Sequence, residues 1–115
     1  LFRSVKIDNG VLIFQMCNLG FDVEVEYGSI INKSCTIAHD SKIGKCTFLS
    51  PAVTFCGGVQ VGNNCFIGAG TTVADNVKIG NNVTVGIGSV ITSDIPDGLS
   101  VIGNPAKVVS GLKIR

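Results

Sequence analysis

Large apolar residues recur at every sixth position along most of the chain. Fifteen successive positions in this register carry Ile, Leu, Val or Phe. They are Ile7, Ile13, Leu19, Val25, Ile31, Ile37, Ile43, Leu49, Phe55, Val61, Ile67, Val73, Ile79, Val85 and Ile91. Because only 45% of the residues are hydrophobic, so long an unbroken run indicates an internal repeat.

A second column, four residues after each large one, holds small or β-branched residues. It runs from Val11 and Cys17 to Val83 and Ser89. Glycine directly follows the large residue at six places, namely Gly20, Gly44, Gly62, Gly68, Gly80 and Gly86. The repeat is therefore a large apolar residue, a position that is often glycine, two unrestricted positions, a small residue and one more unrestricted position. This is the hexapeptide pattern of a parallel β-helix.

Each hexapeptide predicts one side of a triangular coil. A short strand points its large residue inward and a tight corner follows, so three sides need about 18 residues. The fifteen sides make about five coils, which stack at the strand spacing of about 4.8 Å. Glycine or asparagine at the corners tolerates the backbone that a tight turn requires. The asparagines in question are Asn63, Asn64, Asn81 and Asn82.

The repeat predicts one all-β domain, with a helix over residues 1–92 and a tail over 93–115 that packs on it. The register ends at Asp97, where an apolar residue is due, and the tail has no helical pattern. The first coil, to about Val23, is less regular because residues such as Phe14 and Phe21 replace glycine. We expect this coil to be an end cap or a contact surface.

Composition narrows the possible partners. The chain has 15% charged residues, a net charge of +1 and no basic cluster, so we expect no nucleic-acid partner. No apolar run approaches the ~20 residues of a membrane span, and no signal segment opens the sequence.

Cys17, Cys35 and Cys65 occupy the small column, and no Cys-x-x-Cys spacing suggests a metal site. We expect reduced structural thiols in a cytoplasmic protein.

The only histidine, His39, precedes Asp40 at a predicted corner. It lies two places after an inward residue, so its side chain should point out of the prism. One coil later stand Gly57 and Gly58, which leave space for a reacting carbonyl and bring backbone N–H groups near a developing oxyanion. The imidazole suits a general base, and Asp40 could orient it. A lone histidine at a corner is also an ordinary surface residue, and these residues alone leave both interpretations open.

Three motifs together resemble a known family. They are Ile-x-His-Asp at 37–40, x-Gly-Gly-Val at 56–59, and Asp-Ile-Pro-Asp-Gly…Val-Ile-Gly-Asn-Pro-Ala-Lys at 94–107. From about residue 5 to 107 the chain resembles the hexapeptide-repeat acyltransferases, and within them the sialic-acid O-acetyltransferases and UDP-4-amino-sugar N-acetyltransferases. The resemblance implies a left-handed β-helix, a homotrimer, acetyl-CoA as donor, and direct transfer to a sugar amine or hydroxyl with His39 as base.

The resemblance also implies roles for single residues. In the family the donor lies in the groove between neighbouring prisms. By position, the donor residues are Gly57, Gly58, Gly68, Gly86 and Lys107, and Asn32 flanks the histidine on the acceptor side. Some members have a second histidine where this chain has Phe48, and the closest usually carry an amino-terminal Rossmann-like domain. These departures leave the acceptor, and the choice between N- and O-acetylation, open.

Other functions of such a prism make different predictions. A trimerisation or regulatory module should not bind acetyl-CoA and should be indifferent to His39→Ala. A zinc hydratase uses several histidine ligands per site, and the chain has one histidine, so we predict no metal. Cys56 is the one thiol close enough in sequence to Gly57 to be considered as a nucleophile. Direct transfer, however, requires no acyl-enzyme.

Overall fold

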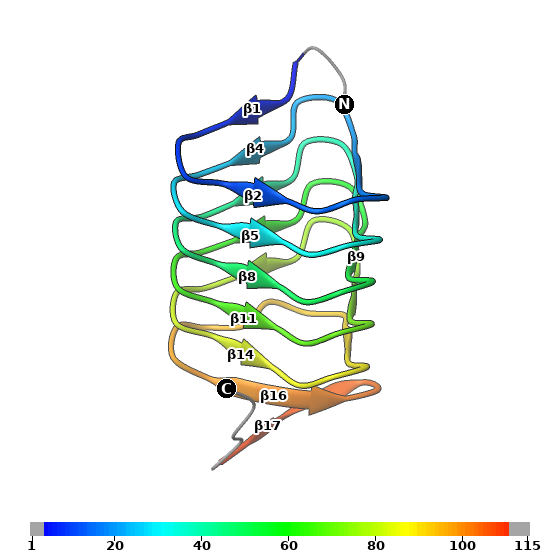
Figure 1. Ribbon diagram of the computed structural model, residues 1–115. Helices are drawn as coiled ribbons and strands as arrows, with labels where there is room; N and C mark the ends of the chain where they lie inside the picture. Colours follow the sequence, from blue (N-terminus) through cyan, green and yellow to red (C-terminus); the bar gives the residue numbers. More distant parts are fainter. Residues whose placement is uncertain (1–3, 111–115) are drawn as a thin grey trace.

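The chain winds into a triangular prism, a left-handed parallel β-helix of about five coils (Figure 1). The computed structural model describes residues 4–110. The outermost parts of the predicted helix and tail, residues 1–3 and 111–115, lie outside the described residues. Each coil of 18 residues gives one two-residue strand to each of three sheets. The fold predicted from the hexapeptide pattern is confirmed.

The three sheets are the sides of the prism, and all their strands run parallel except β17. Sheet A contains β1 (Lys6–Ile7), β4 (Glu24–Val25), β7 (Lys42–Ile43), β10 (Gln60–Val61) and β13 (Lys78–Ile79). Sheet B contains β2 (Leu12–Ile13), β5 (Ile30–Ile31), β8 (Phe48–Leu49), β11 (Phe66–Ile67), β14 (Thr84–Val85), β16 (Ser100–Gly103) and β17 (Ala106–Val109). Sheet C contains β3 (Asn18–Leu19), β6 (Thr36–Ile37), β9 (Thr54–Phe55), β12 (Thr72–Val73) and β15 (Val90–Ile91). We call the turns between them the A–B, B–C and C–A corners.

The second residue of each strand points into the prism. Strands pair in register 18 residues apart, as in Val25 with Ile43. All thirteen predicted large positions from Leu19 to Ile91 are buried, and so is the small column from Val23 to Ser89. Ile7, in the first coil, is 38% exposed. Stacked coils therefore bury one continuous apolar interior, as expected of a solenoid.

Every corner from residue 10 to 88 puts its third residue in the left-handed region of backbone space. This position recurs at each sixth residue and has a φ between 53° and 73°. Glycine, asparagine and aspartate adopt this conformation most readily. Asn64 and Asn82 occupy it, as predicted, and so does Asp40. The short period therefore depends on one repeated turn geometry.

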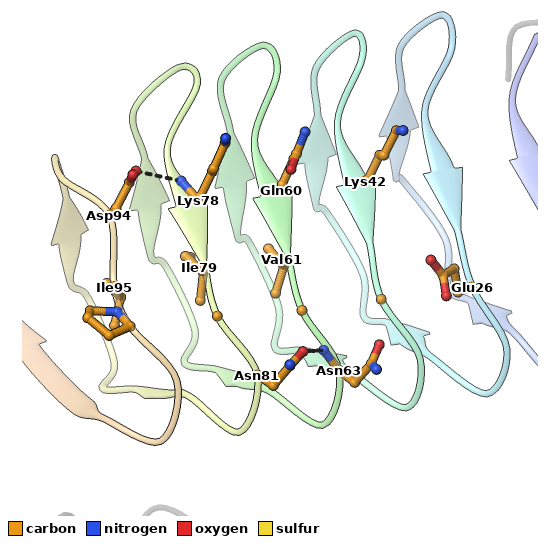
Figure 2. Close-up of a pocket in the computed structure, with 14 residues that line it drawn as sticks. Glu26, Lys42, Gln60, Val61, Asn63, Lys78, Ile79, Asn81, Asp94 and Ile95 are labelled. Atoms are coloured by element: carbon orange, nitrogen blue, oxygen red, sulfur yellow. Dashed lines mark hydrogen bonds between the residues drawn. The ribbon is translucent and has the colours of Figure 1, made fainter.

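Asn63 and Asn81 have a different role from the predicted one, because they are the second residues of their corners. Asn63 Oδ1 accepts a hydrogen bond from the Lys45 N–H (2.8 Å), and Asn81 Oδ1 accepts one from the Asn63 N–H (2.8 Å) (Figure 2). A Cβ on Gly62 would collide with Asn81 Oδ1. The glycines after the large residues of sheet A thus leave room for a ladder of side-chain amides along the A–B corners.

The tail continues the helix through a shortened coil and then closes it. Ile95 is buried and bridges to Ile79, sixteen residues earlier instead of eighteen. The last C–A corner has lost two residues, so the apolar position due at Asp97 is filled at Ile95. Strand β16 then extends sheet B beside β14, and β17 turns back antiparallel to it (Figure 1). No helix in residues 4–110 is long and apolar enough to cross a membrane.

Candidate active site

His39 and Asp40 form the tip of the C–A corner between β6 and β7. The Asp40 N–H donates to the Phe21 carbonyl of the preceding coil (3.0 Å), and the Gly58 N–H donates to the His39 carbonyl from the next coil (2.9 Å). The corner is therefore fixed from both sides along the prism axis. The His39 side chain points outward and is 53% exposed, as the hexapeptide phase predicts.

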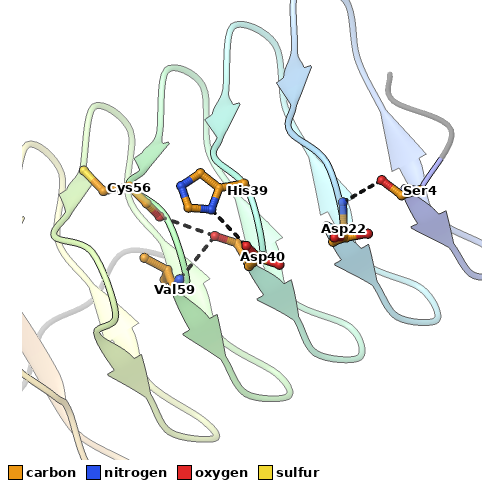
Figure 3. A network of polar contacts seen from close by, with 7 residues as sticks. Ser4, Asp22, His39, Asp40, Cys56 and Val59 are labelled. Atoms are coloured by element: carbon orange, nitrogen blue, oxygen red, sulfur yellow. Dashed lines mark hydrogen bonds and ion pairs between the residues drawn. The ribbon is translucent and has the colours of Figure 1, made fainter.

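Three neighbours surround the His39 imidazole. The Phe21 ring stacks on one side, with ring centroids 5.2 Å apart and planes 12° from parallel. On the other side lies Gly57, where a Cβ would come within 2.6 Å of His39 Cε1 and Nε2. Asp40 Oδ2 lies 3.0 Å from His39 Nδ1 (Figure 3). Because an ionised carboxylate only accepts hydrogen bonds, Nδ1 is the donor, and Nε2 is left to accept a proton.

A groove of about 370 Å³ opens beside the imidazole. Its lining is His39, Asp40, Cys56, Gly57, Gly58, Asp75 and Asn76. Directly after Asp40, buried Ser41 Oγ donates to the Cys56 carbonyl (3.4 Å) and accepts from the Val59 N–H (3.2 Å); Figure 3 shows Cys56 and Val59 beside the histidine corner. This hydroxyl bridges the histidine corner to the glycine corner, so the two lining segments are held at a fixed separation.

Phe21, Asp75 and Asn76 were not singled out from the sequence. They occupy the same corner positions as His39 or Asp40, one coil earlier or two coils later. The 18-residue spacing alone could have placed them there. What the spacing could not show is that the Phe21 ring lies flat on the imidazole, because the direction of an exposed side chain is not set by the repeat.

The predicted residues Asn32, Gly68 and Gly86 lie at B–C corners, so sheet C separates them from His39 in one chain. Asn32 Oδ1 accepts a hydrogen bond from the Lys33 N–H (2.9 Å). Gly68 and Gly86 are buried, and each is explained locally by packing. A Cβ on Gly68 would lie 2.6 Å from the Ile87 nitrogen, and one on Gly86 would lie 2.5 Å from the Ile102 side chain. Their roles toward donor and acceptor stay predictions.

Two further residues that the sequence analysis named, Lys107 and Phe48, lie away from the histidine corner. Lys107 is exposed on β17, in the closing hairpin paired with Ile102. Phe48 is on β8 of sheet B, where its ring stacks on Phe66 with centroids 5.3 Å apart. The proposed contact of Lys107 with CoA phosphates stays a prediction.

The cysteines divide as the phases predict. Cys17, Cys35 and Cys65 donate through Sγ to backbone carbonyls at the same corner of the next coil, those of Asn32, Ser50 and Gly80. Burial raises the pKa of the Cys35 thiol from 9.0 to about 11. Cys46 is exposed, and Cys56 is half-buried in the groove lining. Within residues 4–110, no group of three or more His, Cys, Asp and Glu side chains is placed to hold a metal ion.

A second groove, of about 500 Å³, runs over sheet A and the A–B corners (Figure 2). Lys42, Gln60 and Lys78 project from successive strands on one side, and Asn63 and Asn81 line the other. Its walls are the repeating backbone and the amide ladder, and His39 is not among its lining residues. The histidine groove is therefore the better candidate for chemistry.

Comparison with known proteins agrees with this architecture. The model of the bacterial transferase hexapeptide family (six repeats) matches residues 40–75 and 58–93. No curated protein matches the chain significantly in sequence. Solved structures of the same fold include AntD, an N-acyltransferase from Bacillus cereus in complex with dTDP and 3-hydroxybutyryl-CoA. It is 17% identical, with a TM-score of 0.78 over 93% of this chain and 76% of that one, and supports the fold alone.

Two solved structures are more similar in sequence. The acetyltransferase domain of PglB from Neisseria gonorrhoeae FA1090, in complex with acetyl coenzyme A, is 31% identical, with a TM-score of 0.91 over 94% of this chain and 53% of that one. GDP-perosamine N-acetyltransferase from Caulobacter crescentus, solved as a His-to-Ala variant with CoA and GDP-perosamine, is 33% identical, with a TM-score of 0.92 over 95% and 52%. This chain spans about half the length of either. The chain folds as a hexapeptide-repeat β-helix, and these two structural neighbours are an acetyltransferase domain and a GDP-perosamine N-acetyltransferase.

Proposed function

We propose that this chain is an acetyltransferase that moves the acetyl group of acetyl-CoA to an amino or hydroxyl group of a sugar or nucleotide-sugar. The neighbours solved with acetyl-CoA, or with CoA and GDP-perosamine, support the donor and the class of acceptor. The observation that carries the proposal is the His39 imidazole, held by Asp40 at Nδ1 and facing an open groove through its other edge. The free cysteines fit a cytoplasmic protein.

His39 acts as the general base in this mechanism. Its Nε2 removes a proton from the acceptor amine or hydroxyl as the acceptor attacks the thioester carbonyl that acetyl-CoA supplies. The new C–N or C–O bond forms, the C–S bond breaks, and the proton on Nε2 can pass to the leaving thiolate. Asp40 keeps Nδ1–H as donor, so Nε2 is the basic atom, and it stabilises the imidazolium that forms.

Gly57 is the proposed contact for the reacting carbonyl. The Gly58 N–H already donates to the His39 carbonyl, which leaves the Gly57 N–H as the candidate donor to the oxyanion. A backbone N–H in this role stabilises charge that develops only in the transition state. The missing side chain at Gly57 lets the carbonyl approach both this N–H and the imidazole.

We propose a homotrimer as the working form, with donor and acceptor bound between neighbouring prisms. His39 lies on the C–A edge of the prism, whereas Asn32, Gly68 and Gly86 lie on the B–C edge. Residues on two edges of a rigid prism can share a site only if the edge of another copy comes alongside. Light scattering should therefore give three times the chain mass, and a monomer at working concentration would contradict this arrangement.

The direct test is acetyl transfer by wild type and His39→Asn, with product detected by mass. GDP-perosamine is the first acceptor to try, followed by UDP-linked 4-amino sugars and their hydroxyl analogues. Asparagine approximates the size of histidine but is no base, so kcat should fall by ~10²–10⁴-fold while acetyl-CoA still binds. Full activity in His39→Asn would exclude histidine as base, and an acetyl group found on Cys56 would contradict direct transfer.

A further inference from the structure

Phe21 lies one coil before His39 and at the same corner position. Its ring is nearly parallel to the imidazole, at 12° and with centroids 5.2 Å apart. The two corners are also joined through the backbone, since the Phe21 carbonyl accepts a hydrogen bond from the Asp40 N–H (3.0 Å). The hydrogen bond between Asp40 and Phe21 thus fixes the backbone of both corners, the one that carries the phenyl ring and the one that carries the imidazole.

The corner geometry itself requires no aromatic residue at this position. The next two coils have Gly57 and Asp75 there, and their corners keep the same backbone hydrogen bond to the preceding coil. Phe21 is also no part of the apolar interior, because 47% of the residue is exposed. An exposed phenylalanine therefore occurs at the corner directly before the histidine, and its ring stacks on the imidazole.

Together with the following coil, Phe21 makes a slot for the imidazole. Phe21 covers one face, the backbone at Gly57 lies against the other, and Asp40 holds the Nδ1 edge. Rotation of the exposed ring about its side-chain bonds would break the stack on one side or collide on the other. The slot leaves Nε2 directed to the groove, and among residues 4–110 the ring makes no further hydrogen bond.

We propose that Phe21 is a positioning residue for His39: its ring fixes the orientation in which Nε2 can accept the acceptor's proton. The inference rests on the proposed acetyltransferase function for its kinetic consequence, but its structural part stands independently. A base displaced by about 1 Å can cost ~10²-fold in rate, so loss of the stack should reduce kcat by ~10–100-fold. The KM for acetyl-CoA should change little, since Phe21 does not line the groove.

The variants are Phe21→Ala and Phe21→Leu, which remove the ring, and Phe21→Tyr, which keeps it. Phe21→Leu preserves apolar bulk if the alanine variant folds poorly. Tyr27→Ala is the matched control, because Tyr27 is a similarly exposed ring in the same coil, at the neighbouring A–B corner. Thermal melting and light scattering verify that each variant is folded and assembled.

Two readouts separate the parts of the proposal. The chain has one histidine, so in protein without a histidine tag the imidazole CH signals in proton NMR belong to His39. Loss of the Phe21 ring current should shift them downfield in Phe21→Ala and Phe21→Leu but not in Phe21→Tyr or Tyr27→Ala. Acetyl transfer is then measured on the same samples, and kcat should fall only where the signals move.

Unchanged imidazole signals in both Phe21→Ala and Phe21→Leu would contradict the stacking of Phe21 on His39. Shifted signals with unchanged kcat would overturn the positioning role. If wild type transfers no acetyl group to any acceptor, the proposed function fails while the NMR comparison still decides whether Phe21 orients the ring.

Discussion

At the level of single residues, Gly57 determines how much room the His39 imidazole has. Its backbone is not in the left-handed region, so conformation alone would allow alanine there. The available space excludes alanine, because its Cβ would lie 2.6 Å from His39 Cε1 and Nε2. Glycine at this corner therefore serves the histidine and the groove instead of the turn.

Gly57→Ala should consequently move the imidazole and reduce activity much more than stability. We expect kcat to fall by ~10–100-fold, as for a base displaced by about 1 Å, with a nearly unchanged melting temperature. Ser93→Ala is the control, since Ser93 lies at the last C–A corner and does not line the histidine groove. Wild-type kinetics in Gly57→Ala would mean that the ring adapts at no cost, and the tight slot would then be irrelevant.

Cys35 gives the fold a defined response to alkaline pH. Its pKa is about 11 in the folded chain against 9.0 without burial, so folding favours the protonated thiol. The contribution is complete below pH 9 and is lost as pH rises through 11, by roughly 2–3 kcal/mol. Urea unfolding between pH 8 and 11 should show this decline in wild type and a smaller one in Cys35→Val. Parallel curves for the two proteins would rule out this thiol as its source.

Among structural elements, the A–B corners depend on a ladder that joins one coil to the next. Asn81 Oδ1 accepts from the Asn63 N–H, and Asp97 Oδ1 accepts from the Asn81 N–H (2.7 Å). Each oxygen occupies space that a glycine of the preceding coil leaves open. The ladder thus replaces, at the corner, the backbone hydrogen bonds that pair the strands.

Asn81→Ala should remove one step of the ladder and lower the free energy of unfolding by about 1 kcal/mol. Asn82→Gly is the neighbouring control, because residue 82 needs a positive φ (57°) that glycine adopts freely. Urea denaturation should place Asn81→Ala below wild type and Asn82→Gly at or above it. An unfolding free energy of Asn81→Ala equal to that of wild type would contradict a stabilising role of the Asn81 amide in the ladder.

The strands could be predicted from the sequence because period six repeats thirteen times at buried positions. Prediction failed where the period changes. Ile95 fills the inward position two residues early, and a single shortened corner leaves no repeated signal to detect. The closing hairpin of β16 and β17 was not predicted for a related reason, since its four-residue strands do not follow the two-residue pattern of the earlier strands.

The site was predictable to the extent that it follows the 18-residue spacing. His39, Asp40, Gly57 and Gly58 come together as that spacing requires. The stack with Phe21 depends on side-chain direction, which the repeat does not set. Asn32, Gly68 and Gly86 were assigned through resemblance, and in one chain they lie across sheet C from the histidine.

For the whole molecule, the rigid prism divides the candidate residues between two parallel edges. Donor binding is therefore proposed to depend on edges from two copies, and the folded prism alone would be an incomplete site. An enzyme differs in this from a trimerisation or regulatory module, because only the enzyme needs a donor groove at the subunit boundary.

Calorimetric titration of acetyl-CoA into the assembled protein tests that claim most directly, since it requires no knowledge of the acceptor. We expect saturable binding at about one site per chain, retained in His39→Asn because the base acts on the acceptor. Absence of binding to a well-folded trimer would contradict the acetyltransferase proposal and favour a module that binds protein partners.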